Sequence, residues 1–521
     1  MTSTETPADC RSFALGEYPG ISRFALDLVR RAPAATRFVT PPDGALSPAD
    51  VVRDSALVAA LNEQNRGWGN DVGGSLDRWA EGRSVALIAG QQTGFAGGPL
   101  YTLAKIASLL HAKDELAAKG VESTIFFWLA TEDHDYDEVA TITIDSQDGA
   151  VTLRAAERPL TRRMVGEIAL PESLRRAFIE RSGIDGEFLR PGISFRDSFA
   201  RLIASVVPGE VVLVDALLPE LRRAGAPLFE KIVREWDAVQ EGLRERRAAI
   251  ESAGYPPQIV ADEDGTYTLL YLTREGVRLP IAKKGQVWTL AGRKSSAEEL
   301  LAIIHDAPES VSTSALTRPA LQDLVLHPQL FVGGPAEVSY YAQSSVIHEI
   351  CEIPRPAVAL RGHVLLASSK ILRKIDRWGL GMSEVFDPVD SILARREEPA
   401  RRELEVSIER ARRAFLAELE PLADAVRRSD GSLDRPVTRS LRKIRYQLQR
   451  LGERGERALG RRDVERLRAI QKITGALNPL GQPQDRVAAW ITWWDRFGSE
   501  LVRRMRAVAA ADSDRVTVIG L

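Results

Sequence analysis

Residues 84–130 read SVALIAGQQTGFAGGPLYTLAKIASLLHAKDELAAKGVESTIFFWLA and decide the fold of this chain. The short apolar runs at the two ends of this stretch are typical of buried strands. Between them, Gly97 and Gly98 predict a turn, Pro99 suits the first position of a helix, and Gly120 ends that helix. Strand, turn, helix and strand in this order form a βαβ unit, which predicts a parallel sheet.

Segments further along the chain extend this pattern. VVLVDA at 211–216 predicts another buried strand, and residues 219–252 predict one long helix. Residues 264–294 alternate in polarity around two glycine turns, which predicts an antiparallel insertion rather than more of the parallel core. The stretch PQLFVGGPAEVSYYAQ, 328–343, predicts a return to the core through a second strand, glycine turn and helix.

From about residue 397 the pattern becomes that of a coiled coil. Apolar residues recur three and four positions apart, with Arg and Glu between them, on both sides of the break RSDGSLDRP at 428–436. Two such helices joined by a short loop predict an antiparallel coiled-coil arm, which commonly supports dimerisation. After it, NPLGQPQDR leads into a Trp-rich helix, and RVTVIGL predicts a last strand.

Composition narrows the class of protein. A chain of 521 residues predicts two or three domains. Its 70 Lys and Arg against 72 Asp and Glu argue against a broad nucleic-acid surface. No apolar run approaches the ~20 residues that cross a bilayer, and no signal peptide is visible. The two cysteines, Cys10 and Cys351, suit a reducing interior, so we expect a soluble cytoplasmic protein without disulfides.

The first glycine turn, GQQTGFAGGP at 90–99, is a candidate anion-binding site. Free N–H groups and the positive end of the helix dipole favour a phosphate or carboxylate there. The same turn also fits a purely structural role in packing the helix against its strand, since neither common phosphate-binding motif is present. The candidate binding residues are Gln91, Gln92, Gly94, Gly97, Gly98, Pro99, Tyr101 and Lys105.

The acidic block TEDHDYDEV, 131–139, follows the second strand directly. Like charges so close together raise each other's pKa, so one carboxyl is a candidate general base. The block also fits a site for an ammonium group or a cation, or a simply hydrated loop in which the histidine is structural. The predicted catalytic residues are Glu132, Asp133, His134 and Asp135.

The second glycine turn has the same pattern as the first: the end of an apolar strand, two glycines, and a proline at the start of a predicted helix. It supplies the candidates Gly333, Gly334, Glu337 and Tyr340, with the same structural alternative of a packing turn. The carboxyl ends of parallel strands meet at one sheet edge, so we expect both turns and the acidic block to converge there. No metal site is predicted, because the six histidines are scattered and no thiols are paired.

Several of these motifs together resemble one known family. GQQTGFAGGPLYTLAKI, FFWLATEDHDYDEV, LTRPALQDLVL and FVGGPAEVSYYAQ occur in the order, and at roughly the separations, of the BshC family of cysteine ligases in bacillithiol synthesis. The likeness covers the full length, including the coiled coil and NPLGQPQDR. It implies an α/β fold with a Rossmann-type core and inserted connecting segments, plus an α-helical antiparallel coiled-coil domain.

The resemblance also implies a domain division and an activity. The core would span 1–392 with insertions at about 145–190 and 262–312, the arm 393–475, and a C-terminal helix and strand 476–521 would return to the core. The implied activity is the last step of bacillithiol assembly, which joins cysteine to glucosaminyl-malate in a homodimeric enzyme.

Joining a carboxylate to an amine in water requires activation, most simply by ATP. The family's core is similar to class I aminoacyl-tRNA synthetases, but this chain has no HxGH after its first strand and no clear KMSKS. Two alternatives remain open: a non-catalytic nucleotide-binding scaffold whose coiled-coil arm recruits a partner, or a nucleotidyltransferase-like enzyme on the same fold.

Overall fold

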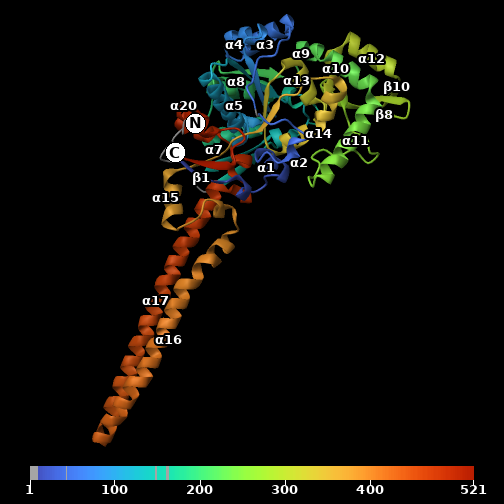
Figure 1. The fold of residues 1–521 in the computed structure, drawn as a ribbon. Coiled ribbons are helices and arrows are strands. Elements are labelled where there is room, and N and C mark those ends of the chain that lie inside the picture. The colour runs from blue at the N-terminus through green and yellow to red at the C-terminus, as the bar shows by residue number, and fades with distance from the viewer. Residues whose placement is uncertain (1–9, 43, 147–148, 160–162) are drawn as a thin grey trace. The chain divides into compact units, whose positions relative to one another are not determined.

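The computed structural model describes residues 10–42, 44–146, 149–159 and 163–521 (Figure 1). Its backbone contacts divide the chain into two units. One contains the described residues up to Ser368 together with Gln482–Leu521, and the other contains Ser369–Gly481. The chain therefore leaves the first unit, builds the second, and returns to the first for its last residues.

A five-stranded parallel sheet forms the centre of the first unit. Its order is β13-β12-β2-β3-β6, and every neighbouring pair is parallel. β2, β3 and β6 read VALIAGQ, STIFFWL and VVLVD, and are buried along almost their whole length, as strands covered on both faces are. This confirms the predicted parallel core. The strands are β2 Val85–Gln91, β3 Ser123–Leu129, β6 Val211–Asp215, β12 Leu330–Gly333 and β13 Ala357–Leu360.

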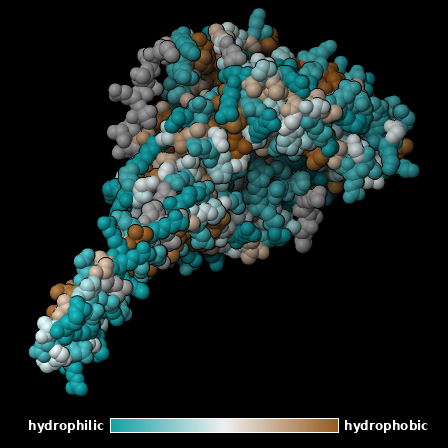
Figure 2. Space-filling view, turned by 60° about the horizontal axis from the view of Figure 1, so that its bottom comes forward, coloured by the Kyte–Doolittle hydropathy of each residue, from teal (hydrophilic) through white to brown (hydrophobic). Residues whose placement is uncertain are grey.

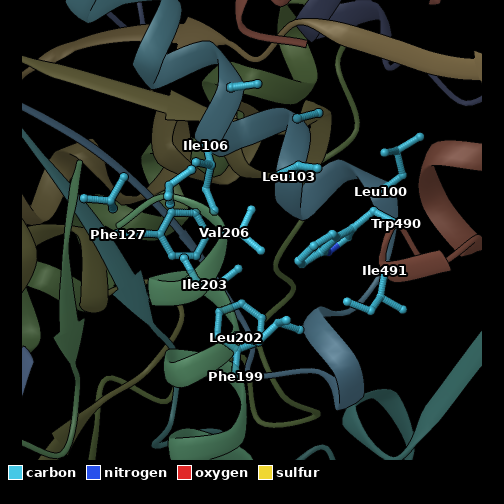
Figure 3. Close-up of a cluster of buried hydrophobic side chains, with 14 of the residues drawn as sticks. Leu100, Leu103, Ile106, Phe127, Phe199, Leu202, Ile203, Val206, Trp490 and Ile491 are labelled. Atoms are coloured by element: carbon cyan, nitrogen blue, oxygen red, sulfur yellow. The ribbon is translucent and has the colours of Figure 1, made fainter. Parts of the chain in front are cut away.

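Helices cover this sheet and bury its apolar faces. Figure 3 shows side chains of α5 (Leu100–Ala118), β3 and α8 (Phe195–Val206) gathered in one cluster with Trp490 and Ile491. All of the labelled side chains in that cluster are buried, and Trp490 comes from near the end of the chain. The C-terminal residues are therefore part of the main core, to which the predicted C-terminal helix and strand were expected to return.

Apart from the three helices between Pro219 and Ser252, the remaining described helices of the first unit are mostly short. They are α1 Arg23–Val29, α2 Pro33–Thr36, α3 Ser55–Gly67, α4 Gly73–Ala80, α6 Tyr136–Val139, α7 Glu172–Ser182, α12 Ala297–Asp306, α13 Arg318–Leu326, α14 Pro335–Cys351, α18 Gln484–Val487, α19 Ile491–Phe497 and α20 Ser499–Val508. Single turns of 3₁₀-helix join several of them.

The structure describes three further sheets besides the parallel core. β4 (Thr141–Ser146) and β5 (Gly149–Arg154) pair antiparallel. A five-stranded sheet has the order β10-β9-β8-β7-β11, with every pair antiparallel, as the glycine turns predict. Its strands are β7 Leu270–Arg274, β8 Val277–Lys284, β9 Val287–Leu290, β10 Arg293–Ser295 and β11 Val311–Thr313.

The last predicted strand joins a sheet that the sequence did not indicate. β15 (Arg515–Gly520) lies between β1 (Cys10–Ala14), to which it is antiparallel, and β14 (His363–Ala367), to which it is parallel. Both ends of the described chain therefore meet in one small sheet within the first unit.

Two local predictions are wrong. Residues 219–252 form three helices, α9 Pro219–Ala224, α10 Ala226–Arg234 and α11 Trp236–Ser252, rather than one. The first break lies at Gly225, where an added β-carbon would overlap the Leu321 side chain. Helix α5 begins at Leu100, with Pro99 as its N-cap rather than its first residue.

The second unit contains the coiled coil that the heptad pattern predicts. Two long helices, α16 (Val389–Ser429) and α17 (Asp434–Leu477), run side by side and are joined by a short turn (Figure 1). Gly452 and Gly455 of α17 lie against Ile408 and Leu404 of α16, so the helices approach closely there. The shorter α15 (Ser369–Arg377) contacts α17.

The surface is largely polar. On the face drawn in Figure 2, hydrophilic residues predominate and hydrophobic residues lie in small scattered groups. Among the described helices, none combines the length and the apolar character that a membrane crossing requires.

Candidate active site

A cavity of about 700 Å³ lies at the carboxyl edge of the parallel sheet. Residues that follow four of the strands line it: Gln92 after β2, Asp133 after β3, Gly334 after β12 and Arg361 after β13. Ligands of open parallel sheets bind at this edge, where loops from neighbouring strands meet. The cavity lies entirely within the first unit.

The predicted site residues divide into three groups. The large cavity is lined by Gln91, Gln92, Tyr101, Lys105, Asp133, Gly334, Glu337 and Tyr340. Gly94, Gly98 and Pro99 line a second cavity of about 420 Å³, which also includes Gln91, Gln92 and Tyr101. Neither cavity is lined by Glu132, His134, Asp135, Gly97 or Gly333.

Lys105 and Glu337 form a buried ion pair in the wall of the large cavity. The Lys105 ammonium contacts the Glu337 carboxylate and donates to the Gly90 carbonyl at 2.7 Å and to Gln91 Oε1 at 2.8 Å. Burial lowers the pKa of Lys105. Because an ammonium has three donors, all of them are used here, and Lys105 has none left for a bound anion. We expected it instead to assist the glycine turn in binding one.

The carboxylate of Glu337 also caps its own helix. Glu337 Oε2 accepts a hydrogen bond of 2.7 Å from the Gly334 N–H at the start of α14. Burial alone would raise its pKa, but Lys105, this N–H and Arg318 together hold it below the ordinary value. Glu337 is therefore ionised, and it fixes the second glycine turn to α5 through Lys105.

The first glycine turn is partly closed by the end of the chain. The Leu100 N–H, at the start of α5, donates to the Ala488 carbonyl at 2.8 Å, and Trp490 Nε1 donates to the Gly97 carbonyl at 3.0 Å. Gly97 has a φ of +87°, and an added β-carbon would overlap the Trp490 ring. Gly97 therefore serves close packing, which is the structural alternative that the sequence left open.

The acidic block separates into buried and accessible carboxylates. Glu132 is 4 % exposed, accepts from Thr313 Oγ1 at 2.8 Å, and lies 3.5 Å from the guanidinium of Arg222. Asp135 accepts from the Glu138 N–H and caps α6. These two predicted catalytic residues have structural contacts and do not line the cavity.

Asp133 is the predicted catalytic carboxylate that does line the large cavity. Gln92 Nε2 donates to its Oδ2, and the His134 N–H donates to its Oδ1 at 2.7 Å. The His134 ring nitrogen Nδ1 is 3.8 Å from the same oxygen Oδ1. Asp133 is thus held in place by Gln92 of the first glycine turn and by the His134 N–H, and His134 lines neither cavity.

Glu138 is an acidic residue of the cavity wall that the site prediction omitted. It lies on α6, one turn after the predicted group, and lines both cavities. Its side chain is exposed, but partial desolvation at the wall, followed by the charges of Asp135 and Asp133, raises the pKa of Glu138. The signal was present in the sequence, since Glu138 belongs to the same acidic block.

Three arginines of the large cavity were also missed: Arg318, Arg361 and Arg486. Arg318 donates to the Tyr340 hydroxyl, and burial raises the pKa of that hydroxyl. Arg361 forms a buried ion pair of 2.5 Å with Asp485.

Residues near the start of the chain contact Arg486 and Asp485, the partner of Arg361. Tyr18 donates to Asp485 at 2.5 Å, and Arg486 donates to the Gly20 carbonyl at 2.5 Å. Arg318 belongs to LTRPALQDLVL and Arg486 to NPLGQPQDR. Both segments contributed to the family resemblance, but the sequence did not indicate that these two side chains line the cavity.

The cavity combines opposite charges within one wall. Arginines from α13, α18 and the residue after β13 share it with Asp133, Glu138 and Glu337. Such a lining suits a ligand that carries both carboxylates and an amine. Among the described residues, no three His, Cys, Asp or Glu side chains are grouped as a metal site.

The fit to ATP is weak at the first glycine turn. The groups of this turn that were expected to receive phosphate already contact other parts of the protein. The Leu100 N–H donates to a carbonyl, Gly97 packs against a tryptophan ring, and the Lys105 ammonium forms an ion pair. We therefore derive no step through a nucleotide at this turn.

Comparison with known proteins gives a consistent family match. The model described as "Bacillithiol biosynthesis BshC, N-terminal Rossmann-like domain" matches residues 45–362, and "Bacillithiol biosynthesis BshC, C-terminal coiled-coil domain" matches residues 364–520.

Three similar proteins are each named "Putative cysteine ligase BshC". The one from Solibacter usitatus is 30 % identical over 421 residues, which cover 75 % of this chain and 77 % of that protein. The one from Koribacter versatilis is 28 % identical over 75 % of each chain. The one from Bacillus cereus is 29 % identical over 65 % of this chain and 68 % of its own.

Proposed function

Because the chain belongs to the BshC family of bacillithiol biosynthesis, we propose that it adds cysteine to glucosaminyl-malate through an amide bond, as the last step of that pathway. The observation that carries the proposal is the mixed lining of the large cavity. Arg318, Arg361 and Arg486 would bind the malate carboxylates, and Asp133 and Glu138 would face the sugar amine.

The buried pair Lys105–Glu337 would position this lining rather than react. It joins α5 to the start of α14, and residues of both helices line the cavity. Tyr340 would be held by Arg318 at the same wall. Fixed groups of this kind can align an amine with a carboxyl carbon, which supplies a large part of the rate acceleration in such reactions.

The cysteine carboxyl must reach the site in an activated form, and ATP is the proposed source of that activation. The hydrogen-bond donors at the first glycine turn already contact other protein groups, which does not favour phosphate binding there. The activating step would therefore take place outside this turn. We propose no metal cofactor.

We also propose a cytoplasmic homodimer. Its support is the exposed apolar side chains along the coiled coil, such as Leu422 and Leu451, which are 58 % and 66 % exposed. Light scattering of the purified protein would give the mass of a dimer, and a monomer at micromolar concentration would contradict this part of the proposal.

The activity has a direct test. The purified chain is incubated with glucosaminyl-malate, cysteine and ATP, and bacillithiol is measured by mass spectrometry. In parallel, the chain is expressed in a bacterium that lacks its own BshC gene. Restored bacillithiol with consumed glucosaminyl-malate is the expected result.

The same assay separates the alternatives. An unchanged thiol pool in the cell would favour the non-catalytic scaffold. Pyrophosphate release without cysteine would favour a nucleotidyltransferase.

A further inference from the structure

The two cavities at the sheet edge share part of their walls. Five residues line both the 700 Å³ and the 420 Å³ cavity: Gln91, Gln92, Tyr101, Glu138 and Arg486. These residues come from the end of β2, from α5, from α6 and from α18. They mark the place where a ligand in one cavity would meet a ligand in the other.

Glu138 is the carboxylate among these shared residues. Asp133 lines the large cavity but not the small one, and Asp137 lines the small cavity but not the large one. Glu132 and Asp135 line neither. Within the described part of the acidic block, Glu138 is thus the acid that reaches both compartments.

We propose that Glu138 accepts the proton of the attacking amine at this junction, with glucosaminyl-malate in the large cavity and the cysteine donor in the small one. This assignment rests on the proposed function. The larger substrate fits the larger space, whose three arginines suit its two carboxylates. The small cavity carries the apolar side chains of Val139, Ile142 and Val487 and suits a compact amino acid.

The surroundings of Glu138 are compatible with this role. Glu138 is exposed at the cavity wall, where partial desolvation and the nearby carboxylates of Asp135 and Asp133 raise its pKa, against the opposing effects of a Gln92 hydrogen bond and the Lys105 charge. A carboxylate made more basic in this way takes a proton more readily near neutral pH. The other charged or titratable groups that line the small cavity are Tyr101 of α5, Tyr136 and Asp137 of α6, Arg154 of β5, Arg158, and Arg486 of α18.

The step balances as an acyl transfer. The co-reactant is a cysteine whose carboxyl carries a leaving group, as an acyl phosphate, an acyl adenylate or a thioester. The sugar nitrogen forms the C–N bond with its lone pair, and the bond from carbon to the leaving group breaks with its electron pair. The proton released from nitrogen goes to the Glu138 carboxylate, which then passes it to the leaving group or to water.

The test compares Glu138→Gln with Glu115→Gln. Glu115 is an exposed residue of α5 outside both cavities, so it controls for the same chemical change at the surface. Bacillithiol is measured in a bacterium that lacks its own BshC gene and expresses each variant, and it is normalised to soluble protein. Thermal melting of each purified variant checks the fold.

We expect Glu138→Gln to lower bacillithiol formation by about 100-fold or more, the usual loss for a removed general base, while Glu115→Gln has no effect. Glu138→Asp keeps a carboxylate at a shorter reach and should recover part of the activity.

Binding gives a second readout. Calorimetric titration of the purified protein with glucosaminyl-malate, in buffers of different ionisation enthalpy, counts the protons exchanged on binding. That count should change in Glu138→Gln and should stay at the wild-type value in Glu115→Gln.

The outcomes separate the two proposals. If wild-type protein restores bacillithiol and Glu138→Gln does so to within about twofold, the assignment of Glu138 is wrong and the proposed function stands. If wild-type protein restores none, the proposed function fails and the assignment fails with it.

Discussion

Two buried ion pairs lie near the same sheet edge and differ in what surrounds them. Lys105–Glu337 lies in the wall of the large cavity and joins two glycine-turn segments. Arg222–Glu132 has side chains that are 4 % and 5 % exposed, and neither residue lines either cavity at this edge. The Arg222 guanidinium also donates to the Ala216 and Glu309 carbonyls.

The difference shows what a charged residue beside a site contributes. Both pairs compensate the cost of burying charge, but Lys105–Glu337 also fixes groups that would contact a ligand. Glu132 and Asp133 are neighbours in sequence, and only Asp133 is turned to the cavity. Position in an acidic motif is therefore a poor guide to role, whereas the partner of each carboxylate is a good one.

The largest expected effect is that of Lys105→Met. It leaves Glu337 buried without its cation, which should lower the free energy of unfolding by about 3–5 kcal/mol and abolish bacillithiol formation. Lys113→Met on the same helix is the matched control, since its pair with Glu210 is partly exposed and should cost about 1 kcal/mol or less. Urea unfolding and the cellular thiol assay measure both, and an active Lys105→Met protein would contradict the positioning role.

The double variant Lys105→Met/Glu337→Gln sharpens the comparison. Removing both charges avoids an unpaired buried ion, so about 1–3 kcal/mol of the stability lost in Lys105→Met should return. Activity should not return, because the link between α5 and the second glycine turn is still missing. A double variant that regains bacillithiol formation would show that the pair serves stability alone.

Glu132→Gln should separate stability from activity. Arg222 keeps its two carbonyl partners, so we expect a loss of about 1–3 kcal/mol in the free energy of unfolding. Bacillithiol formed per folded molecule should stay within about twofold of wild type, because Glu132 does not line the cavity. Loss of activity in a folded Glu132→Gln protein would show that Glu132 takes part in catalysis after all.

The smallest effect concerns acid stability. The pKa of Glu337 is lowered in the folded protein, so below its ordinary value of 4.5 the unfolded chain binds the proton first. Its contribution to stability is therefore complete above pH 4.5 and decreases as the pH falls through the folded pKa. Urea unfolding between pH 7 and about pH 3 should show a shallower acid loss in the double variant than in wild type. The same acid loss of unfolding free energy in the double variant and in wild type would contradict this prediction.

The sequence predicted the fold better than the site. β2, α5 and β3 follow from apolar periodicity and glycine, which are local signals, and the heptads predicted α16 and α17 in the same way. The close approach of Leu321 to Gly225 joins residues almost a hundred positions apart, and no local pattern contains that contact.

For the site, the sequence predicted which loops meet but not which side chains face the cavity. Asp133 and Glu337 were predicted and line it, whereas Glu132 and Gly97 were predicted and are packed against Arg222 and Trp490. Arg361 was missed because its partner, Asp485, lies 124 residues away. Roles set by distant partners need the tertiary structure.

The ends of the chain complete the cavity: Arg486 follows the coiled coil in sequence, and Tyr18 and Gly20 stand near the start. During translation, the loops after β2, β3 and β12 leave the ribosome long before their last wall residue has been made. A nascent or prematurely terminated chain that ends within α17 thus contains all five strands of the parallel sheet but lacks Arg486. The wall of the large cavity is therefore finished only after the coiled coil has been synthesised.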